Sequence, residues 1–153
     1  AIIAGDSEYS VTHERMRGAL KALPDAGLPL AGEARFGPWE AEWGRAAARL
    51  LLNDGAAFDA VICQNDVLAR GCIEELERSG CRVPQDVAVI GHDNSPDYVS
   101  YAHPLLTSID DNNEMLGRQA ALCLLDAIAG HPHHGVERVP VKLIQRESTL
   151  PLD

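Results

Sequence analysis

Polar side chains that could bind a ligand come directly after three short apolar runs of the sequence. Ala1–Ala4 is followed by Asp6, Phe58–Cys63 by Gln64, Asn65 and Asp66, and Val87–Gly91 by His92, Asp93 and Asn94. If these runs are strands of an open parallel sheet, the polar groups gather at its carboxyl edge, where such sheets bind ligands. Amides and carboxylates together offer hydrogen-bond donors and acceptors, which suits a polyhydroxylated ligand. Helix capping explains Asn65 and Asp66 equally well, and a turn is the alternative for Asp93.

Two further side chains could join these groups. Arg15 lies near the start of a predicted helix over residues 11–23, and its guanidinium can hold two hydroxyls or a carboxylate in a bidentate manner. A surface arginine paired with a neighbour such as Glu14 is the alternative. Trp39 stands where a predicted strand passes into a helix, and an indole can stack on the apolar C–H face of a sugar. A core or interface position explains Trp39 equally well.

Other chemistries have weaker support. His131, His133 and His134 share a short segment, but their spacing matches no zinc pattern with a completing cysteine or carboxylate, so we predict a flexible, solvated loop and no metal site. The glycine-rich nucleotide motifs, the GxSxG elbow and HExxH are all missing from the sequence. An enzyme that uses Asp93 as an acid, base or nucleophile needs a second catalytic group, and the sequence nominates none. We therefore predict no catalytic residue and no cofactor.

The charge, the apolar stretches and the cysteines of the sequence limit the classes of partner that we expect. The 153 residues carry 13 basic and 23 acidic side chains, a net charge of −10, and the arginines are scattered, so contact of these residues with nucleic acid is not expected. No apolar stretch approaches the roughly 20 residues of a membrane span, and we expect no membrane partner. The first residues lack the basic start of a signal peptide. The four cysteines form no CxxC pair and are read as reduced thiols of a cytoplasmic protein.

Apolar periodicity predicts the elements that would position these side chains. Helical spacing runs through residues 11–23, 39–52, 66–79 and 112–129, and strand-like runs occupy residues 1–4, 29–36, 58–63, 87–91, 105–109 and 139–143. Alternation of strands with helices predicts an α/β fold, a parallel sheet with helices on both faces.

Five segments, in order, resemble the LacI/GalR family of bacterial repressors. They are Glu14-Arg15-x-x-Gly18, Asn65-Asp66-x-x-Ala69, the segment from Val83 to Asn94, Leu106-Thr107-Ser108-Ile109 followed by Gly117, and Arg146-Glu147-Ser148-Thr149. The resemblance runs from Ala1 to about Thr149. It implies one lobe of a periplasmic-binding-protein-like type I fold. It also implies a small-molecule effector bound between two lobes, with Arg15, Trp39, Asn65 and Asp93 as its contacts. Asn113 stands where the family often has an apolar or aromatic contact, so that contact is not carried over.

The same resemblance divides the chain. Residues 1–153 correspond to the effector-binding domain: its C-terminal lobe plus a helix, about 112–129, that in the family belongs to the other lobe. The helix-turn-helix, the hinge helix and the first part of the other lobe have no counterpart here, so DNA would be reached only through a segment absent from this sequence. Without its partner sheet, helix 112–129 should expose an apolar patch. The family also implies a homodimer, for which residues 98–101, 39–52 and 66–79 are candidate surfaces.

These expectations favour the effector-binding part of a DNA-binding transcriptional regulator, in which a sugar or sugar-like metabolite controls lobe closure and thereby operator affinity. The alternative is a periplasmic sugar-binding protein of a transport system, which shares the fold.

Overall fold

The computed structural model describes residues 1–55 and 57–149, so the predicted domain 1–153 extends slightly beyond the described residues. Its strands are β1 (Ile2–Ala4), β2 (Arg35–Phe36), β3 (Ala60–Cys63), β4 (Ala88–His92), β5 (Thr107–Asp110) and β6 (Lys142–Ile144). Its helices are α1 (Ser10–Asp25), α2 (Ala41–Asn53), α3 (Asp66–Arg78), α4 (Pro96–Val99) and α5 (Asn113–Ile128). None of these helices is long and apolar enough to cross a membrane.

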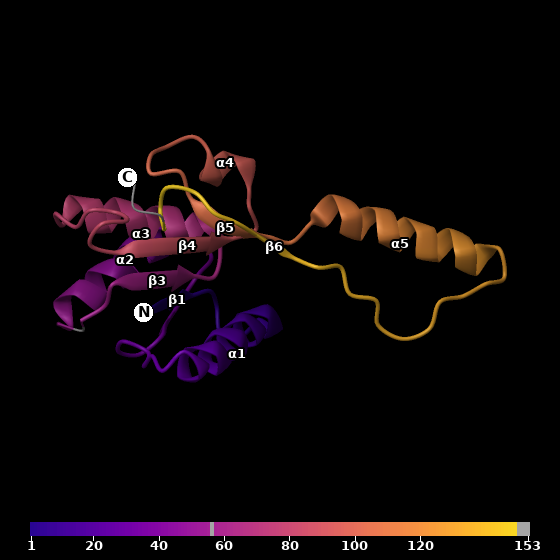
Figure 1. Cartoon of the computed structure of the whole chain (residues 1–153), viewed down its shortest axis with the longest axis horizontal. Helices are drawn as coiled ribbons and strands as arrows, with labels where there is room; N and C mark the ends of the chain where they lie inside the picture. Colours follow the sequence, from indigo (N-terminus) through magenta and orange to yellow (C-terminus); the bar gives the residue numbers. More distant parts are fainter. Residues whose placement is uncertain (56, 150–153) are drawn as a thin grey trace.

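The strands form one mixed sheet in the order β2-β1-β3-β4-β5-β6. The predicted α/β class is confirmed, and β1 to β5 run parallel, but β6 lies antiparallel to β5. The reason is visible in Figure 1: after β5 the chain leaves the carboxyl edge into α5 and returns to the same edge, so β6 enters the sheet from the end at which β5 leaves it.

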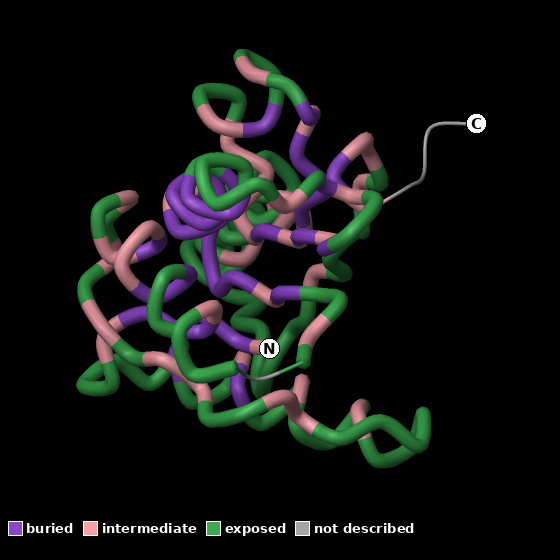
Figure 2. The backbone as a smooth tube through the Cα atoms, turned by 90° about the vertical axis from the view of Figure 1, so that its left-hand side faces the viewer, coloured by how far each residue is buried: buried purple, intermediate pink, exposed green. Residues whose placement is uncertain are grey.

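Helices cover both faces of the sheet, as predicted, but unequally. Alternate strand residues point to opposite faces: Ile3, Val61 and Val89 join the large core with α2 and α3, whereas Ile2 and Ile62 pack on the α1 side. The order of the strands explains this distribution. The crossover from β1 to β2 runs in one direction along the sheet, whereas the crossovers from β2 to β3 and from β3 to β4 run in the opposite direction. Because such crossovers are right-handed, α1 lies on one face and α2 and α3 lie on the other. Most residues of α3 are buried, and Figure 2 shows buried positions gathered in one helix and the strands.

Several predicted boundaries were wrong. The strand expected over 29–36 is limited to Arg35–Phe36, and the helix expected from residue 39 begins at Ala41, with Glu40 in an extended conformation as its N-cap. The short helix α4 was not predicted, because four residues are too few to display helical periodicity. The other elements overlap their predicted ranges.

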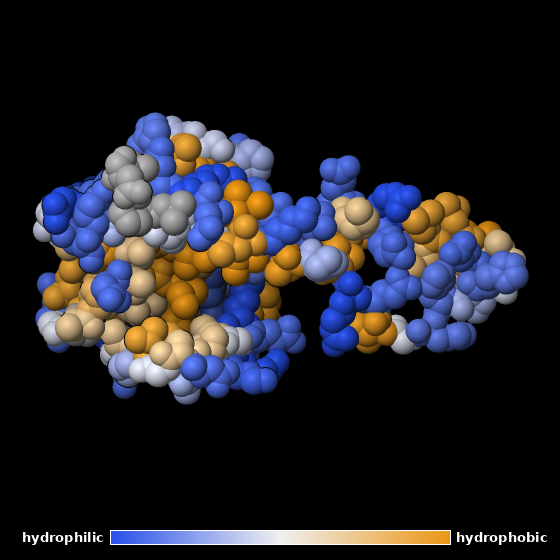
Figure 3. All heavy atoms as spheres, in the orientation of Figure 1, coloured by the Kyte–Doolittle hydropathy of each residue, from blue (hydrophilic) through white to orange (hydrophobic). Residues whose placement is uncertain are grey.

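The helix predicted over 112–129 forms as α5 and stands apart from the sheet (Figure 1). None of its residues is buried, and its large apolar side chains include Leu116, Leu124, Leu125 and Ile128 at 50–75% exposure. Hydrophobic residues accordingly form part of the surface of α5 that is visible in Figure 3. The predicted exposed apolar patch is present.

Helices α2 and α3 cross at two glycines, and the crossing leaves no room for a side chain. A Cβ built on Gly71 would lie 2.0 Å from the Ala41 carbonyl oxygen, and one built on Gly44 would lie 2.3 Å from the Leu68 carbonyl oxygen. Both obstacles are backbone atoms, so the two helices would have to separate to relieve the clash. The crossing therefore depends on glycine for close approach rather than for conformational freedom.

We expect Gly71→Ala to destabilise the protein by about 2 kcal/mol, because overpacking of about 1–3 kcal/mol or more outweighs the roughly 1 kcal/mol that alanine gains over glycine within a helix. Urea unfolding would report this as a lower midpoint with an unchanged slope. Gly18→Ala is the matched control, since a Cβ built on that α1 glycine meets no atom within 4 Å. Equal stability of the two variants would contradict the close-crossing interpretation.

Candidate functional site

A cluster of charged side chains lies at the carboxyl edge of the sheet. The Arg15 guanidinium on α1 donates to the Gln64 carbonyl oxygen at 2.5 Å and to Asp93 Oδ1 at 3.3 Å. The same group lies 3.6 Å from Asp111 Oδ2. His92 joins the two carboxylates, with Nδ1 3.3 Å from Asp93 Oδ1 and Nε2 3.5 Å from Asp111 Oδ1. One guanidinium, two carboxylates and an imidazole thus converge from α1 and from the ends of β4 and β5.

The backbone at Asp93 is held in an unusual conformation. Asp93 has φ +100°, and Asn94 follows with φ +51°. Conformations of this kind cost about 1–3 kcal/mol and persist where surrounding contacts impose them, commonly at functional sites. Here the Asp93 amide donates to the Ile109 carbonyl oxygen at 2.9 Å, and the Asn94 amide donates to Ser108 Oγ at 3.0 Å. These bonds fix the turn that presents the Asp93 carboxylate, which is 41% exposed.

Buried polar neighbours hold the cluster in place. Gln64 accepts from the Gly5 amide at 3.2 Å and donates to the Thr12 carbonyl oxygen at 2.9 Å, so it ties the start of α1, and with it Arg15, to the sheet. Asp66 is 1% exposed and accepts from the Ser95 amide and from Ser108 Oγ. Burial raises the pKa of the Asp66 carboxyl, against the opposing effect of these two hydrogen bonds. Gln64 and Asp66 therefore hold the backbone around the cluster in position.

Asn94 is also engaged within the protein. Its amide nitrogen donates to Asp110 Oδ2 at 3.3 Å, and its Oδ1 accepts from the Arg146 guanidinium at 2.8 Å. Asp6, the first of the strand-end residues, accepts from the Glu8 amide through Oδ1 at 2.9 Å. The strand-end pattern thus contains both turn-forming residues and the exposed groups of the cluster.

Asn65 caps helix α3. Its side chain accepts from the Leu68 amide at 2.8 Å, and the residue is 8% exposed. Asn65 therefore acts as the helix cap that was the alternative to ligand contact. The capping hydrogen bond uses only Oδ1 of the side chain. No hydrogen bond or ion pair of the described residues joins Asn65 to Arg15 or Asp93.

Trp39 lies at the same edge, beside the end of β1. A Cβ built on Gly5 would fall 2.1 Å from its indole ring, so the ring rests directly on the glycine backbone, and it is half-buried against the large core. Trp43, one turn into α2, donates from Nε1 to the Ala4 carbonyl oxygen at 3.1 Å and so has a packing role. Within the part of the chain that the structure describes, no polar contact connects Trp39 to the charged cluster.

The sequence reasoning missed Asp111. Polar residues were identified after three strands, but Asp110 at the end of β5 and Asp111 directly after it occupy equivalent positions, and the same rule would have found them. His92 was noted as a strand-end residue but was not chosen as a contact. Its side chain is 15% exposed and faces both carboxylates.

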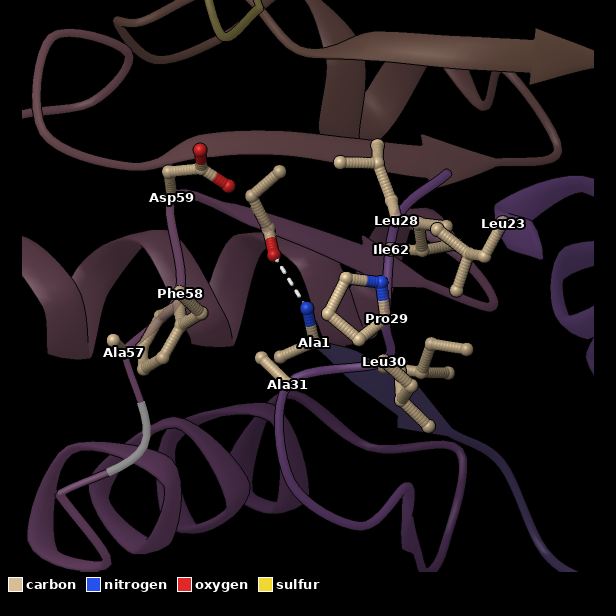
Figure 4. Close-up of a pocket in the computed structure, with 12 residues that line it drawn as sticks. Ala1, Leu23, Leu28, Pro29, Leu30, Ala31, Ala57, Phe58, Asp59 and Ile62 are labelled. Carbon is tan, nitrogen blue, oxygen red and sulfur yellow. Dashed lines mark hydrogen bonds between the residues drawn. The ribbon is translucent and has the colours of Figure 1, made fainter. Parts of the chain in front are cut away.

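Two hollows formed by the described residues border the sheet. One of about 410 Å³ lies between α1 and the sheet face, with Arg15, Gln64 and His92 at its polar end and Met16, Ile90 and Ile109 among its apolar lining. The other, of about 550 Å³, lies at the amino ends of β1 and β3 (Figure 4). It is lined mainly by apolar residues such as Leu28, Leu30 and Phe58. Only the first hollow adjoins the charged cluster.

Known proteins place this geometry in context. The family of periplasmic binding protein-like domains matches residues 1–149. The repressor CytR of Escherichia coli strain K12 is 36% identical over 153 residues, which cover 98% of this chain and 44% of that protein. The regulator CelR of Thermobifida fusca is 35% identical over 150 residues, covering 97% and 44%.

Solved structures agree. A Lac repressor dimer bound to operator and the anti-inducer ONPF matches with a TM-score of 0.90 and 32% identity, over 99% of this chain and 52% of that one. A CelR–cellobiose complex matches with a TM-score of 0.83 and 35% identity, over 97% and 46%. The chain spans about half the length of these relatives. By its sequence and its fold, the chain belongs to the family of periplasmic binding protein-like domains.

Proposed function

We propose that this chain is the effector-binding part of a cytoplasmic, DNA-binding transcriptional regulator, and that its effector is a sugar or sugar-like metabolite. The observation that carries the proposal is the convergence of Arg15, Asp93, Asp111 and His92 at the carboxyl edge of the sheet. Two carboxylates outnumber one guanidinium, so the site favours a neutral ligand with several hydroxyls over an anion. The regulator relatives and the cellobiose complex of CelR support the same class.

Each candidate contact has a distinct role in this proposal. The Arg15 guanidinium donates to two ligand oxygens, and the Asp93 carboxylate accepts from ligand hydroxyls. Asn65 contributes its amide nitrogen, because Oδ1 is held by the cap. Trp39 offers the exposed part of its indole to the C–H face of the ligand. None of these contacts requires a catalytic group or a cofactor.

The domain assignment is part of the same proposal. Residues 1–153 form the C-terminal lobe except for α5, which belongs with the opposite lobe, since it has no buried residue and projects from the sheet body (Figure 1). The ligand would lie between the two lobes and stabilise their closed arrangement. In this proposal DNA is bound by a part of the regulator other than residues 1–153; a structural relative, the Lac repressor dimer, has been solved bound to operator.

The proposal is tested on the full-length protein with a panel of mono- and disaccharides that includes cellobiose. We expect one of them to raise the melting temperature and to change affinity for an in vitro selected DNA site by about 5–150-fold, the usual range of allosteric coupling. Fluorescence anisotropy of labelled DNA measures the second effect. A sugar that binds tightly without any DNA affinity in the protein would favour the periplasmic sugar-binding alternative.

A further inference from the structure

The segment that follows α5 folds back along the helix and meets one line of its side chains. Gln119, Cys123 and Asp126 stand four and three residues apart, which places them on one side of α5. His133 and Glu137 come from the returning segment, which Figure 1 shows running from the end of α5 towards β6. The spacing of the histidines predicts a solvated loop here, but in the structure the histidine and the glutamate of this segment lie beside a cysteine of the helix.

Three side chains of this group carry atoms that bind metals. Cys123 Sγ, a ring nitrogen of His133 and a carboxylate oxygen of Glu137 all lie within 4.8 Å of one another. His133 Nδ1 and Glu137 Oε1 are 2.9 Å apart. Because zinc sits about 2.0–2.3 Å from its nitrogen, oxygen and sulfur ligands, small side-chain movements would bring all three donors onto one ion.

The surrounding hydrogen bonds have the arrangement expected around a metal site. Asp126 Oδ2 lies 2.7 Å from His133 Nε2, so the carboxylate can hold the proton on Nε2 and leave Nδ1 free for a metal. Metal-binding histidines almost always have such a partner on their second nitrogen. Gln119 donates to Glu137 Oε2 at 2.8 Å, which orients the carboxylate with Oε1 towards the imidazole.

Electrostatics also favour a cation at this position. The carboxylate of Asp126 lies 2.7 Å from one nitrogen of the His133 ring, and that of Glu137 lies 2.9 Å from the other. Two negative groups therefore flank the imidazole, and opposite charges attract. A divalent ion between Nδ1 and Oε1 would take the place of the proton that these atoms share.

We propose that Cys123, His133 and Glu137 form a zinc site, with Asp126 and Gln119 as positioning residues and water as the fourth ligand. A thiolate, an imidazole and a carboxylate together match the donor preferences of Zn²⁺. Binding releases the thiol proton to solvent, and it releases the Nδ1 proton as well when the imidazole is protonated on both nitrogens. The ion would fasten the segment between α5 and β6 to the helix. This inference is independent of the effector site, which lies at the carboxyl edge of the sheet.

Titration of the purified, metal-free protein with Co²⁺ and Zn²⁺ tests the site. We expect Co²⁺ to give a thiolate-to-cobalt charge-transfer band that saturates at one equivalent and that Zn²⁺ removes. Cys123→Ser should abolish the band, and Asp126→Asn should retain it while weakening affinity about 10–100-fold, as the loss of a second-shell partner does. Cys81→Ser, which changes a half-buried cysteine outside the cluster, and His134→Ala, which removes a neighbouring histidine, are the matched controls.

Retention of the band and of the affinity in both controls supports the site. No charge-transfer band in the unaltered protein, or an unchanged band in Cys123→Ser, would overturn it and leave an ion-pair network at this position. Equal loss of binding in His134→Ala would overturn the assigned ligand set. Circular dichroism of every variant separates loss of metal binding from loss of fold. Because Cys123 is only partly buried and serine is of similar size, Cys123→Ser is expected to fold normally.

Discussion

Arg15→Ala is expected to weaken effector binding at least about 100-fold, because two charge-assisted hydrogen bonds to the ligand are lost and each contributes about 1.5–3 kcal/mol. The fold should change little. The Arg15–Asp93 pair is partly exposed on both sides, and ion pairs of that kind contribute about 0–1 kcal/mol. Isothermal titration of the full-length protein, with the sugar identified by the panel, measures the affinity, and urea unfolding measures the stability.

Arg17→Ala is the matched control for this experiment. Arg17 lies on the same helix, is exposed, and makes no ion pair within the described residues. Its removal should leave affinity within about twofold, since isolated surface substitutions have small effects. Asp93→Asn tests the opposite partner: it keeps the shape but removes the charge that faces Arg15, and we expect a smaller loss than for Arg15→Ala. Unchanged affinity in Arg15→Ala would exclude Arg15 as an effector contact.

The sequence was sufficient for the α/β class because the core strands carry an unambiguous signal. Runs such as Phe58–Cys63 and Val87–Gly91 are apolar on both faces, and each is followed by helical periodicity, which only a sheet covered on both sides satisfies. The antiparallel direction of β6 could not be predicted from the apolar pattern. A three-residue edge strand has the same alternation whether it runs parallel or antiparallel, and its direction follows from where α5 leads the chain.

The candidate site was predicted in part, for a similar reason. Asp93 was predicted because it follows a strand, and Arg15 because it lies near the start of a helix that faces the same edge. In the structure the Arg15 guanidinium lies 3.3 Å from Asp93 Oδ1. Asp66 and Asp93 both follow strands, so their positions in the sequence do not show which carboxylate is exposed. Asp66 is buried only because of tertiary contacts, in which it accepts hydrogen bonds from Ser95 and Ser108. Packing likewise decides the position of Trp39, whose ring fills the space that Gly5 leaves open.

Arg70→Ala is expected to destabilise the protein by about 3 kcal/mol. Arg70 is 3% exposed, and its guanidinium donates to the carbonyl oxygens of Tyr98, Val99 and Pro104. The substitution removes this donor from the Tyr98 and Pro104 carbonyls, whereas Val99 still accepts from the Leu106 amide. Each buried carbonyl left without a partner costs about 1–3 kcal/mol. Part of that cost is offset, because the charged guanidinium no longer has to be buried, an effect that already lowers the pKa of Arg70. Thermal and urea unfolding measure the net change.

Two variants distinguish hydrogen bonding from packing at this position. Arg70→Met retains most of the buried volume but donates no hydrogen bond, so a loss close to that of Arg70→Ala assigns the stabilisation to the carbonyl contacts. Arg78→Ala is the matched control on the same helix: Arg78 is 66% exposed, and its 3.5 Å contact with Glu75 should be worth less than about 0.5 kcal/mol. A stable Arg70→Met would show that volume alone is required.

The Arg70→Met variant also tests the proposed homodimer surface, because two of the three carbonyls that accept from Arg70, those of Tyr98 and Val99, belong to the segment 98–101 that we propose as part of that surface. The Arg70 guanidinium also lies 5.5 Å from the centre of the Tyr101 ring, which is 62% exposed and so available to a partner. If this segment forms the interface, Arg70→Met should weaken dimerisation measured by sedimentation, whereas Arg78→Ala should not. A dimer of unchanged affinity in a folded Arg70→Met protein would move the interface away from this segment, because its conformation depends on contacts that methionine cannot make.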